Sequence, residues 1–306
     1  MFVFPGQEVF NVGGLRFGGQ MVNPCKMVAT VFYRREGVFL DGGFSRFDRR
    51  LAGLLIEDFE AVGLEYGIES MLDVFAESGD DMVERIDFVC SRTDMPFMVD
   101  STDAEVRMRG VEFAEEVGVV DRVVYNSINA GIKEPEIEFL SASKLNAAVV
   151  LAFNPVDRSL KGKVDILENG SKLLDSGLLD IARRSGVRKV LIDTGVTPLG
   201  DGAGVSCHAI TVLKSRFGLP TGNGVHNVVS GLKGRLIGKD GGCLDASLHA
   251  VSRVLGADFL MFGPIENAKK IYPVMALTEA VVGESLMGRG FCLDGGHPLS
   301  KLMSGV

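Results

Sequence analysis

The sequence predicts an α/β protein with the (β/α)8 fold, or TIM barrel, in which eight parallel strands alternate with helices. Short apolar runs alternate with amphipathic segments along almost the whole chain, which is the pattern of repeated βα units. Several apolar runs end on Asp or Asn, as residues 189–194 do at Asp193, and the carboxyl ends of barrel strands meet at one mouth. A length of 306 residues suits one barrel with insertions. We therefore expect residues 1–306 to form a single barrel domain with an N-terminal hairpin.

A doubly wound open sheet is the competing fold. The sequence divides into eight strand-and-helix repeats, and no G-x-G-x-x-G motif opens its first predicted helix. These two features favour the barrel.

The elements of the first half follow from apolar periodicity. Residues 9–17, with Gly13-Gly14 between two short runs, predict a hairpin that plugs the lower end of the barrel. Residues 27–33 predict the first barrel strand, and apolar residues recur at helical spacing over 47–62, where Ser45 precedes the helix. The next predicted elements are a strand at 70–75, a helix at 80–92, a strand at 96–100, a helix from Thr102 or Asp103 to 117, and a strand at 122–126.

The second half repeats this pattern with one interruption. The polar stretch 155–168 predicts a surface excursion ahead of a helix at 171–185. A weak strand at 219–224 precedes a helix start at 227–230, and Gly231, Gly234 and Gly238 shift most of that helical layer to 244–255. The other predicted elements are a helix at 134–144, a strand at 147–153, a strand at 189–193, a helix at 205–216, a strand at 259–262 and a last helix at 265–286.

Composition excludes several classes of protein. The net charge of -8 argues against a nucleic-acid binder, which needs clustered Lys and Arg. The five cysteines lie far apart without a C-x-x-C pair, so the sequence predicts neither a disulfide framework nor a bound metal. No apolar run approaches the roughly 18 residues of a membrane span, and no signal-peptide pattern opens the chain. We therefore expect a cytoplasmic protein that meets a membrane only through a partner.

Five polar residues at successive strand ends form the candidate site: Asp100, Asn126, Asn154, Asp193 and Asn227. Any one of them alone fits a helix cap or a turn, but five at one barrel mouth favour a binding site. Carboxylates there suit a heterocycle that presents N–H and amino donors, and carboxamides suit a ligand with donors and acceptors. His226, beside Asn227, is expected either to titrate near neutrality or to support the site by a hydrogen bond.

A series of short motifs in a fixed order is similar to one protein family. The motifs are Phe17-Gly18-Gly19-Gln20, Ile86-Asp87-Phe88-Val89, Val99-Asp100-Ser101-Thr102, Tyr125-Asn126-Ser127-Ile128-Asn129, Phe153-Asn154-Pro155, Gly162-Lys163, Leu191-Ile192-Asp193-Thr194, Val196-Thr197-Pro198 and residues 214–227. Over residues 10–230 the chain resembles the H-subunit family of tetrahydromethanopterin S-methyltransferase. That family is similar to the wider pterin-binding methyltransferases, which hold a reduced methylpterin in a TIM barrel.

The resemblance implies a methyltransferase that moves a methyl group from N5-methyl-tetrahydromethanopterin, or methyl-tetrahydrofolate, to cob(I)alamin on a corrinoid protein. It implies that Asp100, Asn126 and Asp193 hold the pterin, and that Asn227, followed by Ser230, hydrogen-bonds near N5. We therefore take Asn227 and Asp193 as catalytic candidates and all five mouth residues as substrate-binding candidates. The alternative is a non-catalytic pterin-binding or scaffolding subunit.

The resemblance also implies partners. They are a corrinoid-carrying protein or subunit and a second copy of this chain, in a membrane-bound complex or in a soluble system. The loops at 195–204 and 222–224, with Gly263 and Asn267, are predicted to line the surface on which the corrinoid protein docks. Residues 231–242 and the C-terminal segment match nothing specific in the family.

Overall fold

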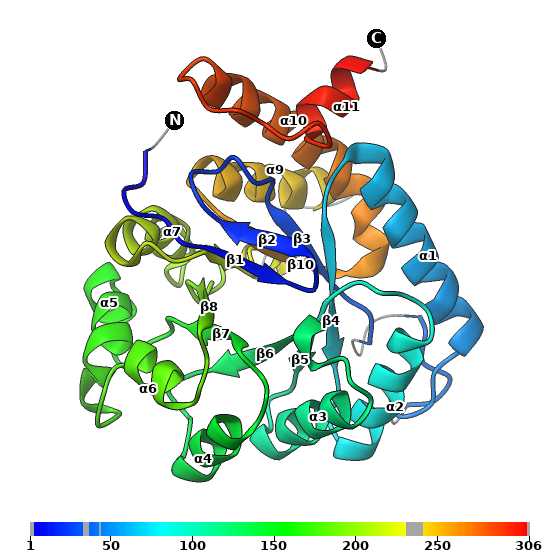
Figure 1. The fold of residues 1–306 in the computed structure, drawn as a ribbon, viewed down its shortest axis with the longest axis vertical. Helices are drawn as coiled ribbons and strands as arrows, with labels where there is room; N and C mark the ends of the chain where they lie inside the picture. The colour runs from blue at the N-terminus through cyan, green and yellow to red at the C-terminus, as the bar shows by residue number, and fades with distance from the viewer. Residues whose placement is uncertain (1–2, 33–36, 43, 231–240, 305–306) are drawn as a thin grey trace.

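The structure is a computed structural model that describes residues 3–304 except 33–36, 43 and 231–240. Eight parallel strands form a closed barrel in the order β10-β3-β4-β5-β6-β7-β8-β9, with helices around the outside (Figure 1). The barrel strands are β3 (Lys26–Thr30), β4 (Ser70–Phe75), β5 (Phe97–Asp100), β6 (Val123–Ile128), β7 (Ala147–Leu151), β8 (Lys189–Asp193), β9 (Thr221–Asn223) and β10 (Phe259–Pro264). The predicted fold class is confirmed.

The helices follow the strands in the alternating order that the sequence predicts. They are α1 (Arg49–Tyr66), α2 (Gly79–Cys90), α3 (Ala104–Glu116), α4 (Glu134–Ala142), α5 (Leu160–Glu168), α6 (Leu178–Arg184), α7 (Ala203–Phe217), α8 (His226–Ser230), α9 (Gly241–Val254), α10 (Ala268–Met287) and α11 (Pro298–Ser304). Within the described ranges, no helix combines the length and the apolar character needed to cross a bilayer.

The N-terminal hairpin closes the amino end of the barrel, as predicted. Its strands β1 (Val9–Val12) and β2 (Leu15–Gly18) pair antiparallel and lie across the barrel opening (Figure 1). Val12 and Phe17 are buried in one apolar cluster with residues that point into the barrel, among them Met71 and Leu191. The side chains of the hairpin therefore complete the core at this end.

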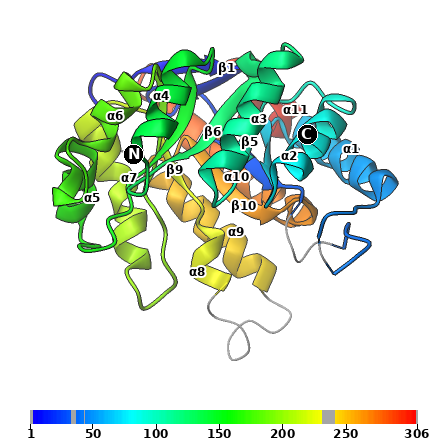
Figure 2. The ribbon, with the colours of Figure 1, turned by 90° about the horizontal axis from the view of Figure 1, so that it is seen from below.

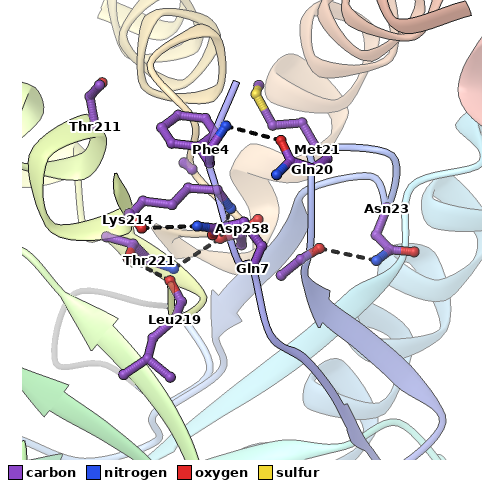
Figure 3. A network of polar contacts seen from close by, with 12 residues as sticks. Phe4, Gln7, Gln20, Met21, Asn23, Thr211, Lys214, Leu219, Thr221 and Asp258 are labelled. Atoms are coloured by element: carbon purple, nitrogen blue, oxygen red, sulfur yellow. Dashed lines mark hydrogen bonds and ion pairs between the residues drawn. The ribbon is translucent and has the colours of Figure 1, made fainter. Parts of the chain in front are cut away.

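A buried polar network anchors the N-terminal segment to the same end (Figure 3). Lys214 forms an ion pair with Asp258, and both side chains are buried. The Thr221 N–H donates to Asp258 Oδ2 at 2.9 Å, and Gln7 Nε2 donates to the Lys214 carbonyl at 3.0 Å. These bonds connect α7, β9 and the start of β10 to the N-terminal segment. They stabilise the amino end of the barrel.

One element prediction is wrong. Residues 160–168 form α5, where the sequence predicted a surface excursion, and the predicted helix at 171–185 is only α6. Ser159 caps α5 by accepting a hydrogen bond from the Gly162 N–H at 3.1 Å, and Ile166 and Leu167 are fully buried. Ser171 and Lys172 have φ angles of 51° and 60°. These left-handed angles prevent the predicted helix at 171–185 from beginning at Ser171.

Smaller differences occur at element ends. Asp48 caps α1 in place of Ser45, and α11 follows α10, which was predicted to be the last helix. The predicted end of the first strand, Tyr33, and the predicted effect of the glycines at 231–240 lie outside the described residues. The strands predicted at 70–75 and 189–193 have the bounds that were predicted.

Candidate functional site

A cavity of about 1050 Å³ opens at the carboxyl ends of the barrel strands. Figure 2 shows α8 and α9 at this end and β1 at the opposite one. Four of the five predicted mouth residues line the cavity: Asp100, Asn126, Asp193 and Asn227. The cavity lies where TIM barrels carry their active sites, at the upper limit of the usual volume for a small ligand.

Two carboxyl groups, Asp73 and Asp100, line one side of this cavity. Thr30 Oγ1 donates to Asp73 Oδ2 at 3.1 Å, while Asp73 Oδ1 is buried without a hydrogen-bond partner among the described residues. Burial raises the pKa of Asp73 to about 6, and the neighbouring polar side chains of Thr30 and Asn126 oppose the rise. Burial, followed by the nearby charge of Asp73, raises the pKa of Asp100 well above its usual range, and Arg107 partly opposes this. Both carboxyl groups therefore hold their protons to a higher pH than an exposed aspartic acid does.

Asn126 lies next to these carboxyl groups because it pairs with Asp100 in the β5–β6 register. The peptide bond between Asn126 and Ser127 is cis. Below them, Arg107 Nη1 donates to the Ser101 carbonyl at 2.6 Å, and Arg107 Nη2 donates to Glu136 Oε1 at 2.8 Å. These bonds join α3 to the residue that follows β5 and to α4.

Asp193 is buried at the end of β8, on the wall opposite β4 in the barrel order. Its Oδ1 accepts a hydrogen bond from the Gly195 N–H at 2.7 Å. Burial raises the pKa of Asp193 to about 6, while the Gly195 hydrogen bond and the positive charge of Lys163 oppose the rise. Gly195 has a φ of 63°, and a Cβ atom there would lie 2.9 Å from Phe153 Cβ, so the turn requires glycine.

Asn227 lies in α8 at the rim of the cavity, where its side chain is exposed. The neighbouring His226 has its Nδ1 3.0 Å from the Met261 carbonyl oxygen, and because a carbonyl only accepts, Nδ1 carries the proton. Burial lowers the pKa of His226, so the imidazole is neutral at neutral pH. This favours the supporting role over titration near neutrality. The side chain of Ser230 lies outside the described part of the structure.

Asn154 does not join the other four residues. Its Nδ2 donates to the Gly162 carbonyl at 3.2 Å and to Ser171 Oγ at 2.8 Å. Its Oδ1 accepts from the N–H groups of Val156 and Asp157 at 3.0 and 3.1 Å. The side chain is 2% exposed and its amide is fully used in holding a loop to α5. Its position argues against the substrate-binding role that the sequence predicted.

The sequence reasoning also missed residues that belong to the site. Asp73 was not singled out, although a lone carboxylate inside the apolar run 70–75 was a usable signal. Arg107, which lines the cavity, was missed because its side chain comes from the covering helix α3. Lys163, which lies behind the cavity wall, comes from α5 and was missed for the same reason. Among the residues that the structure describes, no group of three or more His, Cys, Asp or Glu side chains is arranged to hold a metal ion.

Comparison with known proteins gives consistent results along the whole chain. The family model described as "Tetrahydromethanopterin S-methyltransferase MtrH subunit" matches residues 5–290. The H-subunit of tetrahydromethanopterin S-methyltransferase from Methanothermobacter thermautotrophicus is 36% identical over 310 residues, covering 99% of this chain and 100% of that protein. The H-subunit of the same enzyme from Methanopyrus kandleri is 37% identical over 303 residues, covering 93% of this chain and 94% of that protein.

Among solved structures, the dihydropteroate synthase of Yersinia pestis in a sulfonamide drug complex has a similar fold. The TM-score is 0.65 at 16% identity, over 90% of this chain and 100% of that one. The similarity supports the barrel architecture.

Proposed function

Because this chain belongs to the tetrahydromethanopterin S-methyltransferase MtrH subunit family, we propose that it takes a methyl group from N5 of a reduced methylpterin and passes it to a corrinoid held by a partner protein. The proposed donor is N5-methyl-tetrahydromethanopterin or its relative methyl-tetrahydrofolate. The proposed acceptor is cob(I)alamin. The family is a methyltransferase family, and the choice of donor and acceptor is the proposal.

The observation that carries this proposal is the polar lining of the cavity at the barrel mouth. The pyrimidine edge of a pterin presents amino and ring N–H donors, and Asp100 and Asp193 offer carboxylate oxygens. Asn126 offers a donor and an acceptor between them. The buried Asp73 Oδ1, which lacks a partner among the described residues, is a further acceptor that a bound heterocycle can satisfy.

Transfer of the methyl group requires a hydrogen-bond donor and a source of a proton at N5. An amine leaves poorly, so breaking the C–N bond requires a hydrogen bond or a proton at N5 as negative charge develops there. Asn227 supplies that hydrogen bond from the rim. An amide cannot supply a net proton, so a water molecule or a carboxyl group of the cavity must supply it. Burial raises the pKa of Asp73 to about 6 and that of Asp100 above its usual range, which favours these carboxyl groups as the source.

The corrinoid must reach the methyl group, so the cavity must be open at the carboxyl end of the barrel. The corrinoid supplies a strongly nucleophilic cobalt centre, which must come within bonding distance of the methyl group. Gly195, Gly224, Gly263 and Asn267 line the cavity, which supports docking of the corrinoid protein beside these residues. The related proteins are named as subunits, and we propose that partner subunits deliver the corrinoid and provide any contact with a membrane. A homodimer remains our expectation for the chain itself.

Mixing the purified protein with free cob(I)alamin and either methylpterin tests the proposal. We expect the cob(I)alamin absorbance to be replaced by that of methylcobalamin, faster with the true donor. A protein that binds methylpterin in calorimetry and transfers no methyl group would instead be the scaffolding subunit.

A further inference from the structure

Lys163 in α5 is a buried lysine that lies behind the cavity wall. Its side chain is 2% exposed. Its Nζ donates to the Thr194 carbonyl at 2.6 Å and to the Gly195 carbonyl at 3.2 Å, and the Ala152 carbonyl lies 3.5 Å away. An ammonium group has three N–H donors, so these three carbonyls match its full donor capacity. The charged head therefore joins the ends of β7 and β8 from behind.

One of these contacts leads directly to Asp193. The Thr194 carbonyl and the Gly195 N–H belong to the same peptide group. Lys163 holds the carbonyl side of that peptide, while its N–H side donates to Asp193 Oδ1 at 2.7 Å. Ser206 Oγ holds the next carbonyl, that of Gly195, at 2.9 Å. Because a peptide group is planar, fixing its carbonyl fixes the direction of its N–H.

Few charged side chains affect the pKa values of Lys163 and Asp193. Burial lowers the pKa of Lys163, Asp193 raises it, and Arg158 lowers it. Arg158 is itself paired with Asp201 on the surface. For Asp193, the charged group that opposes the effect of burial is Lys163. Each of the two buried charges thus favours the ionised form of the other.

We propose that Lys163 is a positioning residue for Asp193: its ammonium group orients the Thr194–Gly195 peptide toward the carboxylate and keeps that carboxylate available to accept hydrogen bonds from a bound pterin. The effect on a bound pterin rests on the proposed function. The positioning itself does not, because it concerns contacts within this chain.

The first test measures the titration of Asp193 in the protein without any ligand. Carboxyl ¹³C resonances are followed against pH, and the Asp193→Asn variant assigns the signal. In Lys163→Met the pKa of Asp193 should lie about one unit above that of the wild type, since an opposite charge nearby has been lost. The matched control is Lys214→Met, which removes a buried lysine at the other end of the barrel and should leave the Asp193 titration unchanged. An equal Asp193 pKa in both variants overturns the proposal.

A second variant separates charge from folding. Lys163→Gln retains an amide that donates to the carbonyls but carries no charge, so it should also raise the pKa of Asp193 even if the Met variant does not fold. Lys163→Arg keeps the charge and should restore a pKa close to that of the wild type. A Gln variant that titrates like the wild type contradicts the electrostatic role.

The last test uses methyl-tetrahydrofolate and N5-methyl-tetrahydromethanopterin as probes in calorimetry across pH. In Lys163→Gln we expect weaker binding at pH 7 and recovery toward the wild-type affinity at pH 9, where Asp193 is ionised again. Equal weakening at every pH indicates a merely structural lysine and overturns the positioning role. A wild-type protein that binds neither probe refutes the proposed function, and the ligand-free titration still decides the role of Lys163.

Discussion

Replacing Asp193 with Asn should stabilise the folded protein near neutral pH while removing an anchor for the proposed substrate. Burial raises the pKa of Asp193 from 3.8 to about 6. The folded state therefore binds this proton more tightly than the unfolded state does. The stability that this group contributes is present below pH 4 and is lost as the pH rises through 6.

The size of the effect follows from this difference in pKa. A rise from 3.8 to about 6 corresponds to about 3 kcal/mol once the group is fully ionised. An Asn side chain stays neutral and avoids this loss. Part of the gain is offset, because Lys163 loses the charge that favours its ionised form and Gly195 then donates to a neutral oxygen. We expect a net gain of about 1–2 kcal/mol at pH 7.5.

Urea unfolding at pH 4 and pH 7.5 measures this difference. Asp193→Asn should be more stable than the wild type at pH 7.5, and this advantage should shrink at pH 4. Asp201→Asn, at a half-exposed aspartate on the surface, is the control and should show little change. The reasoning is refuted if the Asp193 variant is less stable than the wild type at pH 7.5, or if its advantage is the same at both pH values. Calorimetry on the same variant should show weakened pterin binding.

Three further predictions concern catalysis and docking. Asn227→Ala should slow methyl transfer about 10²–10³-fold with a much smaller loss of methylpterin affinity, as single-turnover kinetics and calorimetry can show, and unchanged turnover would remove it from the mechanism. Asp100→Ala should chiefly weaken pterin binding, because the donors of the ligand lose a charged acceptor, and wild-type affinity in calorimetry would contradict this. Hydrogen exchange with and without the corrinoid protein should show protection in residues 195–204 and 222–224, whereas protection only at the hairpin end would place the docking surface elsewhere.

Local patterns along the chain were enough to predict the barrel and the position of its mouth. Strand and helix patterns depend on neighbours a few residues apart, so β4 and β8 could be placed to the residue. Parallel strands bring their carboxyl ends together, and this topological rule was sufficient to group Asp100, Asn126 and Asp193 around one cavity.

Which polar side chains face that cavity depends on the packed structure. Asn154 lies beyond the end of β7, whereas Asp193 is the last residue of β8. The amide of Asn154 is bound by Gly162 of α5 and by Ser171, and it does not line the cavity. Asp73 was hidden inside an apolar strand, where the alternation of side chains directs it inward.

Lys163 shows why the sequence alone did not predict the surroundings of these polar side chains. The sequence placed it in a polar surface excursion because charged residues are usually solvated. Two of its acceptors are the carbonyls of residues 194 and 195, more than thirty positions away, and they meet its ammonium group only after α5 and β8 have packed. Local patterns fix where a strand begins and ends, whereas the partner of a buried charge is chosen by segments that the fold brings together.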